Sequence, residues 1–291
     1  MITRFAPSPT GPLHLGHAYS ALLAYDMAMA VGSAFLLRIE DIDRSRARAH
    51  WETQIYDDLA WLGLSWDTPV MRQSERGTSY TQALRRLWNQ GVLFSCTCNR
   101  RDILTAASAP QEGAEPAVGP DGIVYPGTCR HRDHRQMPYP TDGKTVLRLN
   151  MARALDHIGN TPVTFTETGA SPEGETGVIT TSPNTLLTRV GDVVLARRDM
   201  GTSYHLSVVL DDAAQGISHV VRGRDLFEAT AIHVVIQRLL ALPTPIYHHH
   251  RLIRDADGKR LAKRDDARAI AKYRNDGATP ADIRAMVGLG S

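Results

Sequence analysis

Residues 3–17 read TRFAPSPTGPLHLGH, and this stretch decides the fold on which the rest of the chain builds. A short apolar run comes first, a turn rich in proline and glycine follows, and two histidines flank Gly16 at the start of a long apolar-periodic segment. A strand, turn and helix start of this kind direct backbone N–H groups and the positive end of a helix dipole at one spot. The stretch therefore predicts a binding site for a nucleotide polyphosphate.

The following segments extend this start into a β-α-β unit. Leu22, Leu23 and Met27 recur at helical spacing within 18–31, and the apolar run 34–39 suits a buried parallel strand. Acidic residues follow that strand at 40–43, where open α/β sheets bind their ligands. For Asp41 and Asp43 we favour the plainer interpretation of acids at a helix N-terminus.

Composition limits the possible classes of function. The 291 residues are 42% hydrophobic, enough for a full core, and the net charge of +2 does not indicate a nucleic-acid partner. No apolar run reaches the eighteen or so residues of a membrane span, and the N-terminus lacks a leader pattern. We therefore expect a cytoplasmic chain with no membrane partner.

The expected elements divide the chain into four parts. Residues 1–91 form the first half of a Rossmann-type catalytic domain with a parallel sheet, 92–200 an inserted β-rich module, 201–257 the second half, and 258–291 a basic loop and a terminal helix. Helices are predicted within 51–62, 78–89 and 230–242, and strands at 145–149, 163–166, 193–197, 220–223 and 246–250. The segment 106–122, rich in Ala, Pro, Gly and Glu, is expected to be a mobile excursion.

Two clusters indicate phosphate chemistry. His14 and His17 lie at i and i+3, so they face the same side of a helix start and can donate to phosphate oxygens. The basic run Lys259–Arg264 follows a glycine turn, and on its own a solvated basic turn is the better interpretation. Together, the two clusters match the paired signature of class I aminoacyl-tRNA synthetases, with the second cluster similar to their KMSKS loop.

Longer motifs carry a closer resemblance. The runs RFAPSPTG (4–11), RIEDID (38–43), WLGLSWD (61–67), YHL (204–206) and VRG (221–223) occur in this order. They resemble the catalytic domain of the glutamyl-tRNA synthetase family nearly from end to end. The resemblance implies ATP-dependent activation of L-glutamate.

The same resemblance implies a set of glutamate-binding residues. By matching positions these are Arg4, Phe5, Ala6, Pro7, Ser8, Glu40, Tyr204 and Arg222. The residue types suit the ligand, because glutamate needs guanidinium groups for its carboxylates and a carboxylate for its ammonium. We expect Glu40 to take the α-ammonium, and Arg222, with Tyr204 and also Arg4, to take the side-chain carboxylate.

For the reaction, the family implies in-line attack of the glutamate α-carboxylate on the α-phosphate of ATP. His14, His17 and Lys263 are the expected catalytic residues, and the ATP site is expected to contain His14, Gly16, His17, Arg260 and Lys263, with a magnesium ion on the phosphates. One departure is Ala262, where the family loop usually has serine. Its missing hydroxyl removes one hydrogen bond to phosphate.

Three cysteines indicate a structural metal site. Cys96, Cys98 and Cys129 supply three thiolates of a tetrahedral zinc site, since an odd number argues against a disulfide framework. On chemistry alone the fourth ligand is His131 or His134, whereas the resemblance implies Tyr125 as a phenolate. We expect one structural zinc ion held by Cys96, Cys98, Tyr125 and Cys129.

The C-terminal length indicates the tRNA partner. Only 28 residues, 264–291, follow Lys263, so we expect no anticodon-binding domain. This resembles the truncated paralogues of the family that attach glutamate to the queuosine base at position 34 of tRNA(Asp). A truncated synthetase that charges a tRNA 3′ end, or a silent tRNA-binding paralogue, are the alternatives. Arg130, Arg132 and Arg135 are the candidate basic surface for RNA, and we expect a monomer.

Overall fold

The computed structural model describes residues 1–66, 69–108, 116–131, 137–143, 145–253 and 268–290. Its first sheet is parallel, with β1 (Thr3–Phe5) beside β2 (Phe35–Ile39) and β2 beside β3 (Met71–Arg72). Helix α1 (Leu15–Met29) connects β1 to β2, and α2 (Ala49–Trp61) precedes β3. The predicted β-α-β unit is confirmed.

A second set of parallel strands continues this arrangement. β11 (His219–Gly223) pairs with β12 (Ile246–His250), and β12 pairs with β8 (Val163–Glu167), while β9 (Gly177–Thr181) is antiparallel at the edge. The backbone N–H groups of Ser218 and His219 both donate to the Ile2 carbonyl at 3.1 Å, so β11 starts beside β1. The chain order reverses between β1 and β11. Open α/β sheets bind ligands at such a point, outside the carboxyl ends of the strands.

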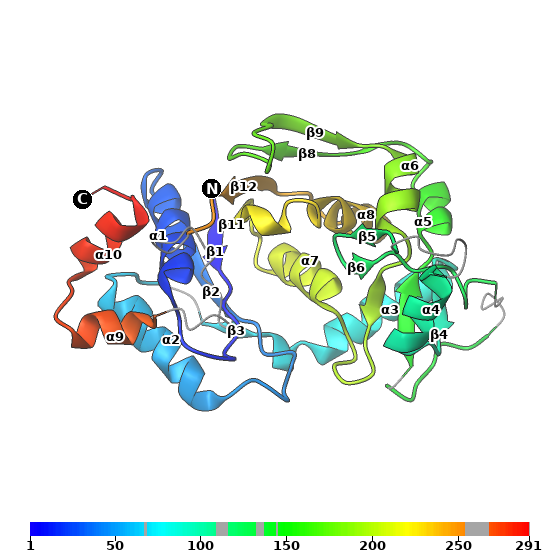
Figure 1. Ribbon diagram of the computed structural model, residues 1–291, viewed down its shortest axis with the longest axis horizontal. Helices are drawn as coiled ribbons and strands as arrows, with labels where there is room; N and C mark the ends of the chain where they lie inside the picture. Colours follow the sequence, from blue (N-terminus) through cyan, green and yellow to red (C-terminus); the bar gives the residue numbers. More distant parts are fainter. Residues whose placement is uncertain (67–68, 109–115, 132–136, 144, 254–267, 291) are drawn as a thin grey trace.

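The helices that follow these strands are α7 (Tyr204–Ala214), the 3-10 turn η3 (Arg224–Leu226) and α8 (Thr230–Leu240). Helix α8 ends two residues before the predicted end because Ala241 adopts a left-handed conformation, with φ of 54°. The terminal helices α9 (Ile270–Asn275) and α10 (Pro280–Val287) lie beside α1 and α2, at the left of Figure 1.

The middle of the chain contains mainly short antiparallel strands. β4 (Leu93–Cys96) and β10 (Val194–Ala196) flank β7 (Val146–Leu149), and β5 (Val118–Gly119) forms a hairpin with β6 (Gly122–Ile123). Around them lie η1 (Gln73–Glu75), α3 (Gly77–Asn89), α4 (Arg100–Ser108), α5 (Met151–His157), α6 (Pro183–Thr185) and the π-helical turn η2 (Leu186–Val190). Strands β8 and β9 instead pair toward β12 and run along the top of the molecule (Figure 1). The boundaries at 92 and 200 stay a prediction.

The segment 106–122 differs in part from its expectation. Its first residues complete helix α4 and its last residues form most of the β5–β6 hairpin, while 109–115 lie outside the described residues. The hairpin is packed tightly: a Cβ on Gly119 would lie 2.1 Å from the Arg189 carbonyl oxygen. Composition did not predict the hairpin, because glycine occurs where two backbones pack closely as well as where the chain is mobile.

Candidate active site and metal centre

A cavity of about 530 Å³ lies where β1 and β11 meet. Every residue predicted to bind glutamate lines it, namely Arg4, Phe5, Ala6, Pro7, Ser8, Glu40, Tyr204 and Arg222. His14, Gly16 and His17 line the same cavity, whereas Arg260, Ala262 and Lys263 lie outside the described residues. The structure therefore brings the predicted glutamate-binding residues and the histidine motif together in one cavity, and the individual roles stay predictions.

The two histidines cap the helix and also line the cavity. His14 is the N-cap of α1, where its Nδ1 accepts from the Gly16 N–H at 3.1 Å, and His17 Nδ1 accepts from the His14 N–H at 3.2 Å. Because both Nδ1 atoms accept, each neutral ring carries its proton on Nε2. A Cβ on Gly16 would lie 3.0 Å from the His14 ring, so glycine permits this cap. Helix capping and ligand binding are therefore compatible here.

Arg4 is paired with a buried acid that the sequence interpretation did not identify. Its Nε and Nη2 donate to the two carboxylate oxygens of Asp212 at 2.9 and 3.2 Å, and Arg38 Nη1 donates to Asp212 at 2.7 Å. Burial raises the pKa of Asp212, but Arg4 and Arg38 outweigh it and bring the pKa to about 2. Arg4 Nη1 donates to the Val221 carbonyl at 3.3 Å, so within the described residues these bonds leave one N–H on each of Nη1 and Nη2.

Glu40 is a buried acid at the cavity whose negative charge is only partly stabilised by the neighbouring arginines. Its Oε1 accepts from Arg38 Nη2 at 3.1 Å. Burial raises the pKa of Glu40, and Arg38 and Arg4 offset only part of this effect. A bound ammonium group would stabilise the ionised form. Asp41 accepts from the Ser74 N–H in the 3-10 turn η1, and Asp43 accepts from the N–H and hydroxyl of Ser45 in its own loop.

Arg222 is held by side chains from two elements, β12 and α8. Its guanidinium contacts His249 of β12 and His233 and Thr230 of α8, and its side chain lines the cavity from the end of β11. Neither His249, within the predicted strand 246–250, nor His233 was among the predicted site residues. A histidine inside the apolar run of α8 was the available signal.

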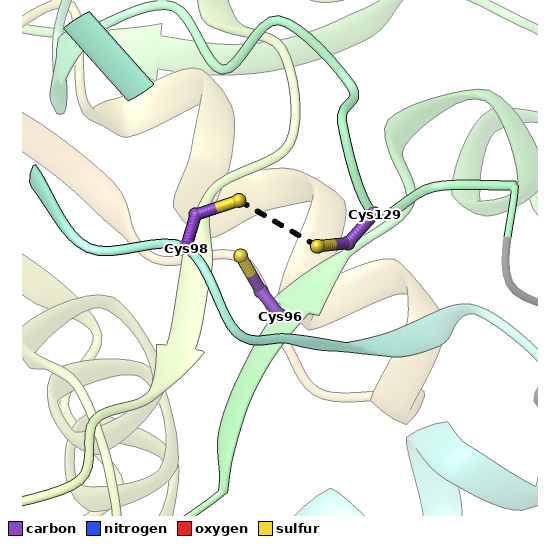
Figure 2. Close-up of side chains that lie close together, drawn as sticks. All are labelled: Cys96, Cys98 and Cys129. Carbon is purple, nitrogen blue, oxygen red and sulfur yellow. Dashed lines mark hydrogen bonds between the residues drawn. The ribbon is translucent and has the colours of Figure 1, made fainter. Parts of the chain in front are cut away.

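The three cysteines form one cluster, in which the side chains point toward one another (Figure 2). The Sγ atoms of Cys98 and Cys129 are 3.6 Å apart, and the Tyr125 hydroxyl lies 3.4 Å from Cys96 Sγ and 3.6 Å from Cys98 Sγ. In a tetrahedral zinc site two sulfurs lie about 3.8 Å apart, and a sulfur and an oxygen about 3.5 Å. The four predicted ligands therefore fit a zinc ion.

The alternative fourth ligands do not join this cluster in the part of the chain that is described. His131 is exposed and outside the group, and His134 lies outside the described residues. Burial raises the pKa of Cys129, but hydrogen bonds from Thr97 and Tyr125 lower it to about 6. Burial also raises the pKa of Tyr125, so this side chain needs a cation to become a phenolate.

A larger groove of about 1,210 Å³ connects the two sites. Glu40 and Tyr204 belong to its lining as well as to that of the cavity, and Cys98 and Tyr125 lie along its other part. Arg100, Arg148, Arg197 and Arg198 line it too. Of the predicted basic surface, Arg130 pairs with Asp192, whereas Arg132 and Arg135 lie outside the described residues.

Comparison with known proteins identifies the family. The model of the class I tRNA synthetase (E and Q) catalytic domain matches residues 1–290. A glutamyl-Q tRNA(Asp) synthetase of Rhodobacter capsulatus is 63% identical and is covered completely by 99% of this chain. That of Symbiobacterium thermophilum is 39% identical, over 96% of this chain and 83% of the relative.

Solved structures agree in fold. A glutamate tRNA ligase from Elizabethkingia meningosepticum, in complex with its amino acid, matches 99% of this chain with a TM-score of 0.76 and 26% identity, and the chain spans 60% of its length. Methionyl-tRNA synthetase of Mycobacterium tuberculosis, 11% identical with a TM-score of 0.58, shares the fold alone. Among the described residues no helix has the length and apolar character of a membrane span. The chain belongs to the class I tRNA synthetase (E and Q) catalytic-domain family and is a ligase.

Proposed function

We propose that this ligase activates L-glutamate with ATP and transfers it to the queuosine base at position 34 of tRNA(Asp). The observation that carries the proposal is the single cavity in which the glutamate-type residues and the histidine motif meet. The names of the relatives from Rhodobacter and Symbiobacterium support the tRNA(Asp) partner. The cytoplasm, where tRNA and ATP occur, is the location that this function implies.

In the proposed pocket, Glu40 binds the α-ammonium and Arg222 with Tyr204 binds the side-chain carboxylate. Burial supports these roles, since Arg222 is 6% exposed and the side chain of Glu40 is 11% exposed. Charged hydrogen bonds gain strength in such surroundings. Glutamine would leave the buried guanidinium without a charge partner, which costs affinity. Arg4 is oriented by Asp212 and can offer a ligand one N–H from each of Nη1 and Nη2.

The chemistry needs no nucleophile from the protein. The glutamate α-carboxylate attacks the α-phosphate of ATP, and pyrophosphate leaves. His14 and His17 donate from Nε2 toward the phosphates, and Lys263 neutralises the developing charge. Magnesium accompanies ATP as its counter-ion. Described residues on either side of Lys263 support its role, because Ile253 lines the cavity and Ala269 forms a bridge with His14.

We also propose that the cysteine cluster holds one structural zinc ion through Cys96, Cys98, Tyr125 and Cys129. When bound, the ion supplies a cross-link between β4 and the loop after β6. That region buries only a small apolar cluster of its own, which includes Phe94. Metal binding then contributes directly to its folding.

The groove is the proposed path of the modified nucleotide. Because it shares Glu40 and Tyr204 with the cavity, a base splayed into it from a tRNA loop reaches activated glutamate. The five arginines that line it, Arg46, Arg100, Arg148, Arg197 and Arg198, suit the phosphate backbone. In this assignment the cyclopentene ring of queuosine contacts polar side chains of the groove.

Two measurements test the proposal. The purified chain is expected to catalyse glutamate-dependent ATP–pyrophosphate exchange without tRNA, and absence of exchange would favour a silent paralogue. Transfer of labelled glutamate is then compared between tRNA(Asp) with and without queuosine, with periodate-treated tRNA as a further arm. Labelling confined to queuosine-containing tRNA supports the proposal, whereas equal labelling of both indicates 3′ charging.

A further inference from the structure

The guanidinium of Arg222 is almost fully occupied by protein acceptors. Nε donates to His249 Nε2 at 3.1 Å, and Nη1 faces His233 Nδ1 at 3.2 Å. Nη2 donates to the Leu226 carbonyl at 3.2 Å and to Thr230 Oγ1 at 2.8 Å. A guanidinium has five N–H groups. Within the described residues, these contacts leave one N–H, on Nη1, for a ligand.

The contacts determine where each histidine carries its proton. Arginine offers no acceptor, so the ring nitrogen that faces it must be unprotonated. His249 therefore carries its proton on Nδ1, which faces the carboxylate of Glu167. His233 carries its proton on Nε2, which faces His205 Nδ1 at 3.1 Å, and His205 Nε2 in turn faces Asp121 at 3.3 Å. Two series of hydrogen bonds thus start at Arg222. One passes through His249 to Glu167, and the other passes through His233 and His205 to Asp121.

Burial favours the uncharged form of both histidine rings. His233, His249 and Glu167 are 1%, 2% and 1% exposed. Burial and the nearby Arg222 lower the pKa of His233, and burial also lowers that of His249, although Glu167 opposes this. A protonated ring at either position would place an N–H group against the guanidinium. The two rings are therefore neutral acceptors.

We infer that His233 and His249 are positioning residues, which as uncharged acceptors fix the guanidinium of Arg222 and leave Nη1 for the side-chain carboxylate of the amino-acid substrate. This inference rests on the proposed function, since it assigns Arg222 to glutamate. The two histidines do not touch the substrate. They act on affinity and amino-acid choice through Arg222.

Paired variants test this inference. His233→Phe and His249→Phe keep the ring volume and remove the acceptor. His233→Asn and His249→Gln place an amide oxygen near Nδ1 and Nε2, so they keep it. The phenyl variants are expected to raise the glutamate KM about 10- to 100-fold in ATP–pyrophosphate exchange, the range for one lost hydrogen bond to a charged group. The kcat and the ATP KM should change little, because the lost contact affects ground state and transition state alike.

The amide variants are expected to recover most of the glutamate KM. A purely structural role would instead change kcat, both KM values and the melting temperature together. Phenyl variants with the wild-type glutamate KM, or amide variants as impaired as the phenyl ones, would overturn the inference while leaving the proposed function intact. A wild-type chain without glutamate-dependent exchange would overturn both. Asp156→Ala on the exposed surface of α5 is the control variant.

A measurement on the wild-type chain tests the protonation states of His233 and His249 even where a variant fails to fold. Nitrogen NMR of histidine-labelled protein distinguishes the two neutral tautomers and the charged ring. His233 is expected as the Nε2–H form and His249 as the Nδ1–H form at pH 7. A charged ring at either position, or the opposite tautomer, would overturn the inference.

Discussion

Asp212→Asn should destabilise the chain strongly at neutral pH. The side chain is 11% exposed and forms ion pairs with both Arg4 and Arg38. Removing one member of a buried ion pair costs about 3–5 kcal/mol, because the other charge stays buried without a partner. Here Arg4 loses its carboxylate, whereas Arg38 keeps Glu40. Much of the typical stability of about 5–15 kcal/mol would be lost.

The pH dependence of this loss follows from the pKa. Asp212 has a pKa of about 2 in the folded chain, against about 3.9 in an unfolded one. A lowered carboxyl pKa contributes stability that is complete above the unfolded value and is lost as pH falls through the folded value. The difference in unfolding free energy between wild type and variant should therefore shrink by about 2 kcal/mol between pH 6 and pH 2.

Urea unfolding followed by circular dichroism measures both quantities. The matched control is Asp26→Asn, since Asp26 also accepts two bonds from one arginine, Arg284, at 2.8 Å each, but with its side chain 39% exposed. This pair should contribute no more than about 1 kcal/mol. Equal losses in the two variants, or a loss for Asp212→Asn that does not change with pH, would refute the reasoning.

Three further predictions concern other sites. Asp58 is wholly buried, and its oxygens have no hydrogen-bond partner within the described residues. Its pKa is raised to about 6 in the folded chain. Ionisation of Asp58 therefore opposes folding as the pH rises from about 4. Asp58→Asn should therefore gain about 2 kcal/mol relative to wild type between pH 4 and pH 7 in urea unfolding, and no gain would contradict the burial argument. Cys98→Ser should reduce the bound zinc measured by mass spectrometry from about one ion per chain, and a wild type purified without zinc would exclude the metal site. Glu40→Gln should raise the glutamate KM about 10- to 100-fold, with the ATP KM within about twofold in pyrophosphate exchange; a change confined to the ATP KM would assign Glu40 to the nucleotide.

The sequence predicted what lies in contiguous motifs. The stretch 3–17 indicated a strand, a turn and a helix start, and the acid at 40 was placed correctly at the end of a buried strand. In both places the local pattern determines the local structure. The same holds for the cysteine cluster, since three of its members are the only cysteines of the chain.

Contacts between distant elements were not predictable in this way. Asp212 follows another acid in an apolar helical run, and only the fold decides that Asp211 faces Gln73 and Tyr80 whereas Asp212 faces Arg4. The role of His233 likewise depends on its contact with Arg222 of β11, a distant element. Side chains that orient a ligand-binding arginine carry no motif, because what they need is a position in space.

The bridge between His14 and Ala269 has a practical consequence for shortened chains. The N–H of Ile270 donates to the Leu13 carbonyl at 2.9 Å, and Ile270, Ile283 and Val287 are wholly buried against the core around α1. Fully burying three such side chains is worth about 5–9 kcal/mol, as much as many whole domains possess. A deletion that begins at residue 268 would therefore unfold the nucleotide-facing helix at the opposite terminus. Residues 269–287 and helix α1 therefore belong to one cooperative folding unit, although about 250 residues separate them in sequence.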